Sequence, residues 1–313
     1  MTQTHRVLLT GCSGFLGPFV IDELVAAGHE VVGFDLLTPA NKTDPFIRGD
    51  FTSKRDLVRA LTGITAVCHL GGVGDVYLAE RRGAAALRTN AYGTKIVCDA
   101  CMDSGVETLV YASTWEVYGK PHANPVSETH PCNPESLYSI SKLAGELFVR
   151  RAGAINGMTT ISLRLGPGYG PGMRESTAIS SFIRRSMEKT PLPVYGDGSQ
   201  LRQFTHVSDI GRAFAIATST PSSDSSRTYN IISDESVTIL DLATRIGRRN
   251  GVGIKFLPPR VPEPPSAYIT AAKAFSELGW RSKIPFEDGL EELIATFPVA
   301  KGHWTRLGPE STS

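Results

Sequence analysis

The first 165 residues alternate between short apolar runs and stretches with helical spacing, and this alternation narrows the choice of fold more than any other feature. Apolar runs occupy 7–10, 30–35, 66–70, 107–113 and 159–165. Helical patterns lie between them, at 15–28, 53–63, 80–104 and 137–156. Strands that are apolar throughout and joined by helices form parallel sheets with both faces covered. The sequence therefore predicts the α/β class, with a doubly wound parallel sheet.

The sequence changes character after residue 165. Gly/Pro-rich stretches occur at 166–176 and 256–265. With 313 residues, the chain is long enough for a large sheet domain and a smaller lobe. We expect a Rossmann domain over 1–165, to which about 205–232 returns. The smaller α/β lobe then comprises 166–204 and 233–298, and a polar tail comprises 299–313.

Composition excludes several classes of function. Lys plus Arg number 32 and Asp plus Glu 31, so no charge excess indicates nucleic acid or a membrane surface as a partner. No apolar run is long enough for a membrane span, and the N-terminus lacks the pattern of a signal peptide. Five cysteines, an odd number, suggest reduced thiols and a cytoplasmic protein. Cys98 and Cys101 lie in a helical stretch and are expected in the core, and no cluster predicts a metal site.

Gly11, Gly14 and Gly17 follow the first apolar run and precede the first helical pattern. Such a turn lets backbone N–H groups approach a pyrophosphate at a helix N-terminus. Asp35 ends the second apolar run, where a carboxylate can accept both ribose hydroxyls of NAD and repel the 2′-phosphate of NADP. Leu36 follows it instead of an arginine. These residues favour NAD as the cofactor, although Asp35 could also be an ordinary turn residue at a strand end.

Tyr138 and Lys142 are four residues apart in a helical stretch and therefore project from one face. An ammonium beside a phenol favours the phenolate and lowers its pKa. Such a tyrosine can remove a hydroxyl proton while hydride leaves the same carbon. The alternative is an ordinary surface pair, because this spacing is common.

An ordered set of motifs runs to about residue 290: the glycine turn, "GDF" (49–51), "HLGG" (69–72), "TNAYGT" (89–94), "ASTWEVYG" (112–119), "YSISK" (138–142), "RLGPGYGPG" (164–172), "YGDGSQLRQFTHVSDI" (195–210) and "LGW" (278–280). With this set the chain resembles the extended short-chain dehydrogenases/reductases, in the group of nucleotide-sugar epimerases and dehydratases. The resemblance implies a nucleotide-diphosphate sugar bound between the two lobes, a role in carbohydrate biosynthesis, and a homodimer formed through helices 80–104 and 137–156.

The resemblance also implies roles for particular residues. Thr114 would bind the sugar 4-hydroxyl, Tyr138 would be the base, and Lys142 would hold the nicotinamide ribose. The implied cofactor-binding residues, besides Tyr138 and Lys142, are Gly11, Ser13, Gly14, Phe15, Leu16, Gly17, Asp35, Asp50, Phe51, Leu70, Gly71, Gly72, Asn90 and Ser113, with Asp50 and Phe51 at the adenine. The implied substrate-binding residues are Thr114, Trp115, Arg164, Pro167, Tyr195 and Arg202, with Arg202 at the diphosphate.

The chain departs from the pattern of this group at several positions. Pro167 replaces an asparagine, Gly72 an alanine, Gln203 an aspartate and Leu137 a proline, while Gly74 stands where galactose-type epimerases often have lysine. These departures leave three features of the reaction undetermined: the nucleotide base of the substrate, its sugar, and the stereocentre that is changed.

Glu116 and Trp115 distinguish the possible reactions. Glu116 stands where related dehydratases carry the base for the sugar C5–H, whereas Trp115 stands where their acid protonates the leaving 6-hydroxyl. We expect an NAD-dependent epimerase acting through a 4-keto intermediate, with a dehydratase that uses Glu116 as the alternative. A non-catalytic NAD-sensing regulator is a third possibility, which the intact set Thr114, Tyr138 and Lys142 disfavours.

Overall fold

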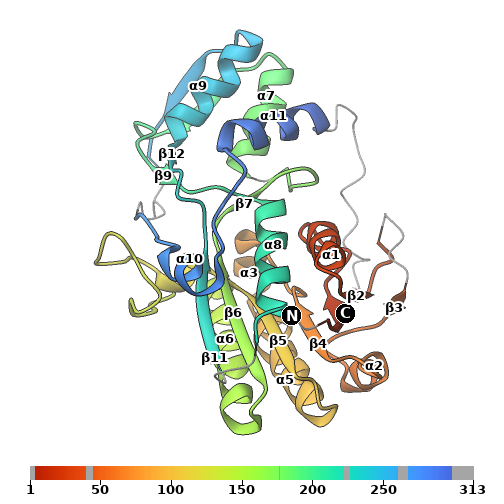
Figure 1. The fold of residues 1–313 in the computed structure, drawn as a ribbon. Helices are drawn as coiled ribbons and strands as arrows, with labels where there is room; N and C mark the ends of the chain where they lie inside the picture. The colour runs from red at the N-terminus through yellow and green to blue at the C-terminus, as the bar shows by residue number, and fades with distance from the viewer. Residues whose placement is uncertain (1–3, 40–44, 176, 222–225, 260–266, 298–313) are drawn as a thin grey trace, which may run out of the picture.

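A parallel sheet forms the centre of the protein in the computed structural model, which describes residues 4–39, 45–175, 177–221, 226–259 and 267–297 (Figure 1). Within these residues the sheet has seven strands in the order β11-β6-β5-β4-β1-β2-β3. Their bounds are β1 Arg6–Thr10, β2 Glu30–Asp35, β3 Phe46–Arg48, β4 Ala66–His69, β5 Thr108–Thr114, β6 Thr159–Leu165 and β11 Ser226–Ile231. The predicted α/β doubly wound fold is confirmed. The expected polar tail at 299–313 lies outside the described residues.

The order of strands reverses at β1, which pairs with β2 on one side and β4 on the other. At such a point the connections of a doubly wound sheet leave toward opposite faces. Thr10, the last residue of β1, pairs with Phe34 and His69. Open α/β sheets bind their ligands at such a point, outside the carboxyl ends of the strands.

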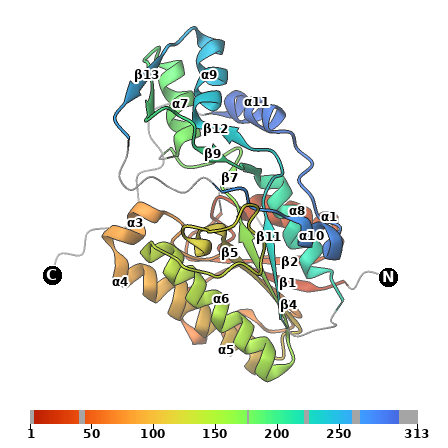
Figure 2. The same ribbon diagram turned by 90° about the vertical axis from the view of Figure 1, so that its left-hand side faces the viewer.

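Alternate residues of each strand point to opposite faces, and each face has its own core. Val7 and Leu9 belong to the core under α1 (Gly17–Ala26) and α8 (Val207–Thr218). Leu8 belongs to the core under α2 (Lys54–Ala60), α5 (Thr94–Asp103) and α6 (Leu137–Asn156). Figure 2 shows α1 and α8 on one side of the sheet and α5 and α6 on the other. Because both faces are covered, every residue of β5 and β6 is buried.

Local signals explain where α6 begins and ends. The Ser136 side chain accepts from the Ser139 backbone N–H, and the Ser139 side chain accepts from the Ser136 backbone N–H, so the two form a capping box. The helix stops at Gly157, which has a φ of 74° that favours glycine. These signals fix the start of α6 one residue before Tyr138.

The stretch 80–104, expected as one helix, is divided in the structure. It contains α3 (Val76–Arg81), α4 (Gly83–Ala86) and a π-helical segment, η1 (Leu87–Gly93), before α5. Arg82 leaves helical geometry, with φ −125° and ψ 49°, and so ends α3. Within η1 the Asn90 side chain binds both backbone groups of Val73, at 2.7 and 3.0 Å. The helical periodicity of the sequence could not predict this tertiary contact.

A smaller group of elements lies beyond the carboxyl ends of the sheet strands (Figure 1). A separate core joins its three helices to two parallel strands. The helices are α7 (Ala178–Met187), α9 (Ile239–Asn250) and α11 (Phe286–Thr296), and the strands are β8 (Leu192–Tyr195) and β13 (Ile254–Leu257). Short pairs connect it to the sheet: β7 (Gly168–Tyr169) with β10 (Thr205–His206), and β9 (Leu201–Arg202) with β12 (Val237–Thr238). The helix α10 (Ala272–Leu278) packs against β11.

Candidate active site

The glycine turn between β1 and α1 is built from backbone packed against backbone. A Cβ on Gly11, which has a φ of 76°, would lie 2.6 Å from the Gly71 nitrogen. A Cβ on Gly17 would overlap the Cys12 carbonyl group. Glycine is therefore required for the turn itself, which places Ser13, Gly14, Phe15 and Leu16 at the N-terminus of α1.

Asp35 ends β2 and closes the turn. One carboxylate oxygen accepts from the Ser13 backbone N–H at 3.0 Å, and the other accepts from the Leu37 N–H at 3.1 Å. Since each carboxylate oxygen can accept more than one hydrogen bond, Asp35 can still accept ribose hydroxyls. The turn and the carboxylate thus fit a dinucleotide.

The other predicted cofactor residues after β3 and β4 lie along the same edge of the sheet. The Phe51 ring packs on Gly71 and Gly93, where a Cβ would meet the ring at 2.7 Å in each case. Asp50 accepts from the Thr52 N–H and hydroxyl, both at 2.8 Å, and so fixes the loop that carries Phe51. Leu70 and Gly72 follow β4, while Asn90 holds the next residue of that loop.

Thr114 and Tyr138 meet at the carboxyl end of β5, and Lys142 lies on the same helix as Tyr138. Thr114 is the last residue of the strand, and the Tyr138 hydroxyl is hydrogen-bonded to its side chain. Lys142 follows one turn later on α6, where its ammonium lies 4.4 Å from the centroid of the Tyr111 ring. Thr114 and Lys142 are buried. The structure thus joins Tyr138 to Thr114 directly and places Lys142 over the Tyr111 ring of the same strand, β5.

The expected lowering of the Tyr138 pKa by Lys142 is wrong. Burial raises the pKa of Tyr138, and the Glu116 carboxylate raises it further. The Thr114 hydrogen bond and the Arg174 charge oppose these effects, but burial is the larger cause. Lys142 is itself desolvated: burial lowers its pKa to about 7, against the opposing effect of Glu146. In this structure the phenol is therefore protonated at neutral pH.

Glu116, the fourth predicted catalytic residue, faces the same group. It belongs to the short 3-10 helix η2 (Trp115–Tyr118), and its backbone N–H donates to the Thr114 hydroxyl at 3.3 Å. Burial raises the pKa of Glu116 to about 7, although the Arg202 charge lowers it. A carboxyl group with a pKa near 7 can exchange protons at neutral pH. Trp115, beside it, packs against the core of the sheet.

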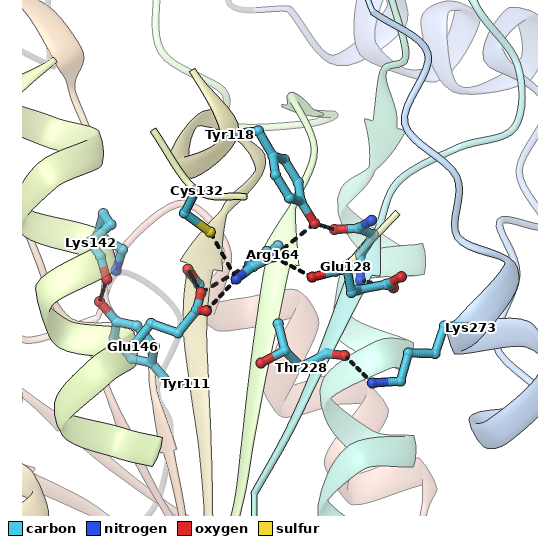
Figure 3. A network of polar contacts seen from close by, with 11 residues as sticks. Tyr111, Tyr118, Glu128, Cys132, Lys142, Glu146, Arg164, Thr228 and Lys273 are labelled. Carbon is cyan, nitrogen blue, oxygen red and sulfur yellow. Dashed lines mark hydrogen bonds and ion pairs between the residues drawn. The ribbon is translucent and has the colours of Figure 1, made fainter. Parts of the chain in front are cut away.

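The predicted substrate-binding residues outside β5 and η2 lie in several different parts of the structure. Arg202 on β9 acts electrostatically on Glu116, and the Pro167 carbonyl accepts from the Thr205 N–H at 2.9 Å where the two lobes join. Tyr195 ends β8, and the residue after it, Gly196, lines an open surface pocket of about 820 Å³. Arg164 lies elsewhere, in a buried network with Glu146 (Figure 3).

Sequence reasoning missed Arg174. It lies in the loop after β7 and donates to the Gly74 carbonyl at 2.6 Å, while its other terminal nitrogen lies 3.2 Å from the Asp75 carboxylate. Its charge also lowers the pKa of Tyr138. The only signal in the sequence is a cation in a Gly/Pro-rich loop, which is too common to identify a site.

The geometry of this edge of the sheet corresponds to a known family. Residues 7–231 match the NAD-dependent epimerase/dehydratase family. The chain belongs to this family. The resemblance expected from the motifs, the enzyme class and the NAD cofactor are thereby confirmed at the level of the family.

Relatives within the family catalyse different reactions. A dTDP-glucose 4,6-dehydratase of Streptomyces niveus is 27% identical, over 96% of this chain and 95% of the relative. A UDP-glucose 4-epimerase of Mycolicibacterium smegmatis is 28% identical, over 93% of this chain and 98% of the relative. The structure of MoeE5 in complex with UDP-glucuronic acid and NAD is 31% identical, covers 93% of this chain and 98% of its own, and superposes with a TM-score of 0.85. The chain is thus similar to both epimerases and dehydratases.

The described residues contain neither a candidate membrane span nor a candidate metal site. None of the helices in this part of the chain combines the length and apolarity needed to cross a membrane. Nor does any cluster of His, Cys, Asp or Glu side chains within it have the arrangement of a metal site. Cys98 and Cys101 are buried on α5, as expected, and burial raises the pKa of both thiols.

Proposed function

We propose that this protein epimerises a nucleotide-diphosphate sugar through a transient 4-keto intermediate. The observation that carries the proposal is the hydrogen bond of Tyr138 with Thr114 at the carboxyl end of β5, with Lys142 one turn further along the helix of Tyr138. The turn at 11–17 and Asp35 would hold NAD, and Lys142 would bind its nicotinamide ribose. Bound NAD would supply the chemistry of hydride acceptance and return at the sugar carbon.

The protein's own groups would move the proton. In its deprotonated form, Tyr138 would take the proton of the sugar 4-hydroxyl as the C4–H is removed, so that this carbon becomes a ketone. Thr114 lowers the pKa of Tyr138 by hydrogen bonding and would orient the same hydroxyl. Tyr138 would give the proton back to the 4-oxygen as the ketone is reduced on its opposite face. The overall reaction would be redox neutral.

A second candidate is dehydration, favoured by one specific observation. Glu116 is close enough to raise the pKa of Tyr138, and its own pKa of about 7 suits a base that removes the C5–H beside a 4-keto group. Trp115 favours epimerisation, because its indole N–H is not an acid that can protonate a leaving hydroxyl. We therefore place epimerisation first.

The substrate would be a sugar linked to UDP or dTDP, because similar proteins act on or bind such compounds. Arg202 and Arg174 bring two cations to the region of Glu116 and Tyr138, as a diphosphate or an acidic sugar requires.

The test is to incubate the purified protein with UDP-glucose, UDP-galactose, UDP-glucuronic acid and dTDP-glucose and to analyse the products by NMR. A sugar inverted at C4 supports the proposal. A 4-keto-6-deoxy product supports the second candidate instead, and no product from any member of this panel contradicts both.

A further inference from the structure

A buried polar network lies next to the candidate catalytic residues (Figure 3). Its centre is the ion pair of Arg164 on β6 with Glu146 on α6, with Nη2–Oε1 at 2.6 Å and Nε–Oε2 at 3.1 Å. The two side chains are only 7% and 9% exposed. Figure 3 shows the guanidinium surrounded by groups from several segments of the chain.

The network reaches the catalytic segment at both of its ends. Ser113, the residue before Thr114, donates its hydroxyl to Glu146 at 2.7 Å. Arg164 donates to the Tyr118 hydroxyl at 2.9 Å, and Tyr118 is the last residue of the helix η2 that contains Glu116. The Tyr118 hydroxyl in turn donates to Asn230 on β11 at 2.7 Å. The segment 113–118 is thus held on both sides of Thr114 and Glu116.

The network reaches the catalytic helix as well. Glu146 lies one turn after Lys142 and two turns after Tyr138, on the same helix α6. It therefore ties the helix that carries Tyr138 and Lys142 to the strand that carries Thr114. Its negative charge also raises the pKa of Lys142, against the effect of burial.

Every N–H of Arg164 already has an acceptor within the protein. Nε donates to Glu146, Nη1 donates to Tyr118 and the Glu128 carbonyl, and Nη2 donates to Glu146 and the Cys132 sulfur. A guanidinium has five N–H groups, so these five bonds use all of them. Arg164 would have to give up one of these contacts in order to bind a diphosphate.

We propose that the Arg164–Glu146 pair, with Tyr118 and Ser113, is a positioning device that sets the distance between the β5 end carrying Thr114 and Glu116 and the α6 face carrying Tyr138 and Lys142. Arg164 then acts through other residues and is not a substrate ligand. A buried ion pair contributes little net stability, because desolvation offsets its attraction, whereas its bidentate geometry fixes two backbones relative to each other. Misplacing catalytic groups by about 1 Å costs about a hundredfold in rate.

The sharpest test compares two tyrosine variants. Tyr118→Phe removes one hydroxyl and breaks the link from Arg164 to Asn230 while leaving the ring in place. Tyr229→Phe is the matched control: this buried tyrosine on β11 bonds Glu277 on α10, outside the network. The probes are UDP-glucose, UDP-glucuronic acid and dTDP-glucose, because the kinetic readout rests on the proposed function.

With whichever probe is turned over, Tyr118→Phe should lower kcat by about tenfold to a hundredfold with little change in KM or in bound NAD. Tyr229→Phe should keep the wild-type kcat. A second variant, Glu146→Leu/Arg164→Met, removes both charges together, so neither is left buried and unpaired. It should fold with a melting temperature near that of the wild type and also lose kcat. Wild-type kcat in Tyr118→Phe or in a folded double variant overturns the proposal.

A structural readout separates failure of this inference from failure of the proposed function. Amide hydrogen exchange over residues 113–118 and 137–146 should be faster in Tyr118→Phe than in the wild type and unchanged in Tyr229→Phe. If no probe is turned over, the proposed function fails, but faster exchange confined to these two segments still supports the positioning device. Unchanged exchange in Tyr118→Phe overturns it.

Discussion

The carboxylate of Glu116 raises the pKa of the Tyr138 phenol in the candidate active site. Burial is the largest cause of the raised pKa of Tyr138, and the charge of Glu116 is the second largest. Ionised Glu116 therefore makes it harder for Tyr138 to lose its proton, whereas neutral Glu116 does not. The protonation of Glu116, with its pKa of about 7, couples to the first chemical step at neutral pH.

Glu116→Gln should separate the two candidate reactions. The amide keeps the shape of the side chain but cannot accept a proton from carbon. If the protein dehydrates its substrate, turnover in D₂O should place deuterium on carbon in the wild type, whereas the variant should stall with bound NADH, losing about 10²–10⁴-fold in rate. If it is a plain 4-epimerase, wild-type product should carry no carbon-bound deuterium and the variant should keep most of its rate. Glu188→Gln, an exposed residue at the end of α7, is the control.

The same substitution should change how stability depends on pH. Burial raises the pKa of Glu116 from its ordinary value of 4.5 to about 7 in the folded protein, so the folded state binds this proton more tightly than the unfolded chain does. This contribution to stability is present below pH 4.5 and is lost as the pH rises through 7. Glu116→Gln should therefore gain stability relative to the wild type between about pH 5 and pH 8, by up to about 3 kcal/mol. Urea denaturation at both pH values measures this difference, and an equal difference at both would contradict the raised pKa.

Tyr138→Phe should abolish turnover with every substrate while leaving the fold intact. The first oxidation then lacks its base, and removal of a general base costs about 10²–10⁴-fold. Product formation measured by NMR gives the rate, and circular dichroism checks the fold. Tyr77→Phe, on exposed α3, should keep the wild-type rate. A Tyr138→Phe enzyme with more than a tenth of the wild-type rate would exclude Tyr138 as the base.

The protein should retain NAD through purification. Denaturation followed by chromatography of the released nucleotide should give NAD and no NADP, because the Asp35 carboxylate repels a 2′-phosphate. Asp35→Asn should release less NAD, whereas Asp22→Asn, exposed on α1, should release as much as the wild type. Recovery of NADP from the wild type would overturn the assignment of Asp35.

We propose that the protein forms a homodimer through α5 and α6, which lie side by side on one face of the sheet (Figure 2). Apolar side chains on α6 are exposed, among them Leu147 at 44% and Ile140 at 41%. Light scattering should give twice the mass of one chain, as closed pairs dominate homo-oligomers. Leu147→Glu should yield a monomer, and Val25→Glu, exposed on α1, should remain dimeric. A wild-type monomer at micromolar concentration would contradict the proposal.

The elements of the sheet could be predicted from local patterns. The strands at 30–35 and 159–165 and the helix at 137–156 have the predicted bounds, since apolar continuity, capping and a final glycine all act within a few residues. The division of 80–104 could not be predicted, because helical periodicity does not show the backbone break at Arg82 or the contact of Asn90 with Val73.

The sequence by itself determined the class of the fold and provided Thr114, Tyr138 and Lys142 as catalytic candidates, because a glycine turn between strand and helix and a Tyr–Lys pair on one helical face are local patterns. Only the tertiary structure decided the charges of these groups and the position of Arg164. Burial is the largest cause of the raised pKa of Tyr138. Arg164 pairs with Glu146 because β6 packs against α6. Burial and pairing depend on segments distant in the chain, so no spacing of residues along the sequence could reveal them.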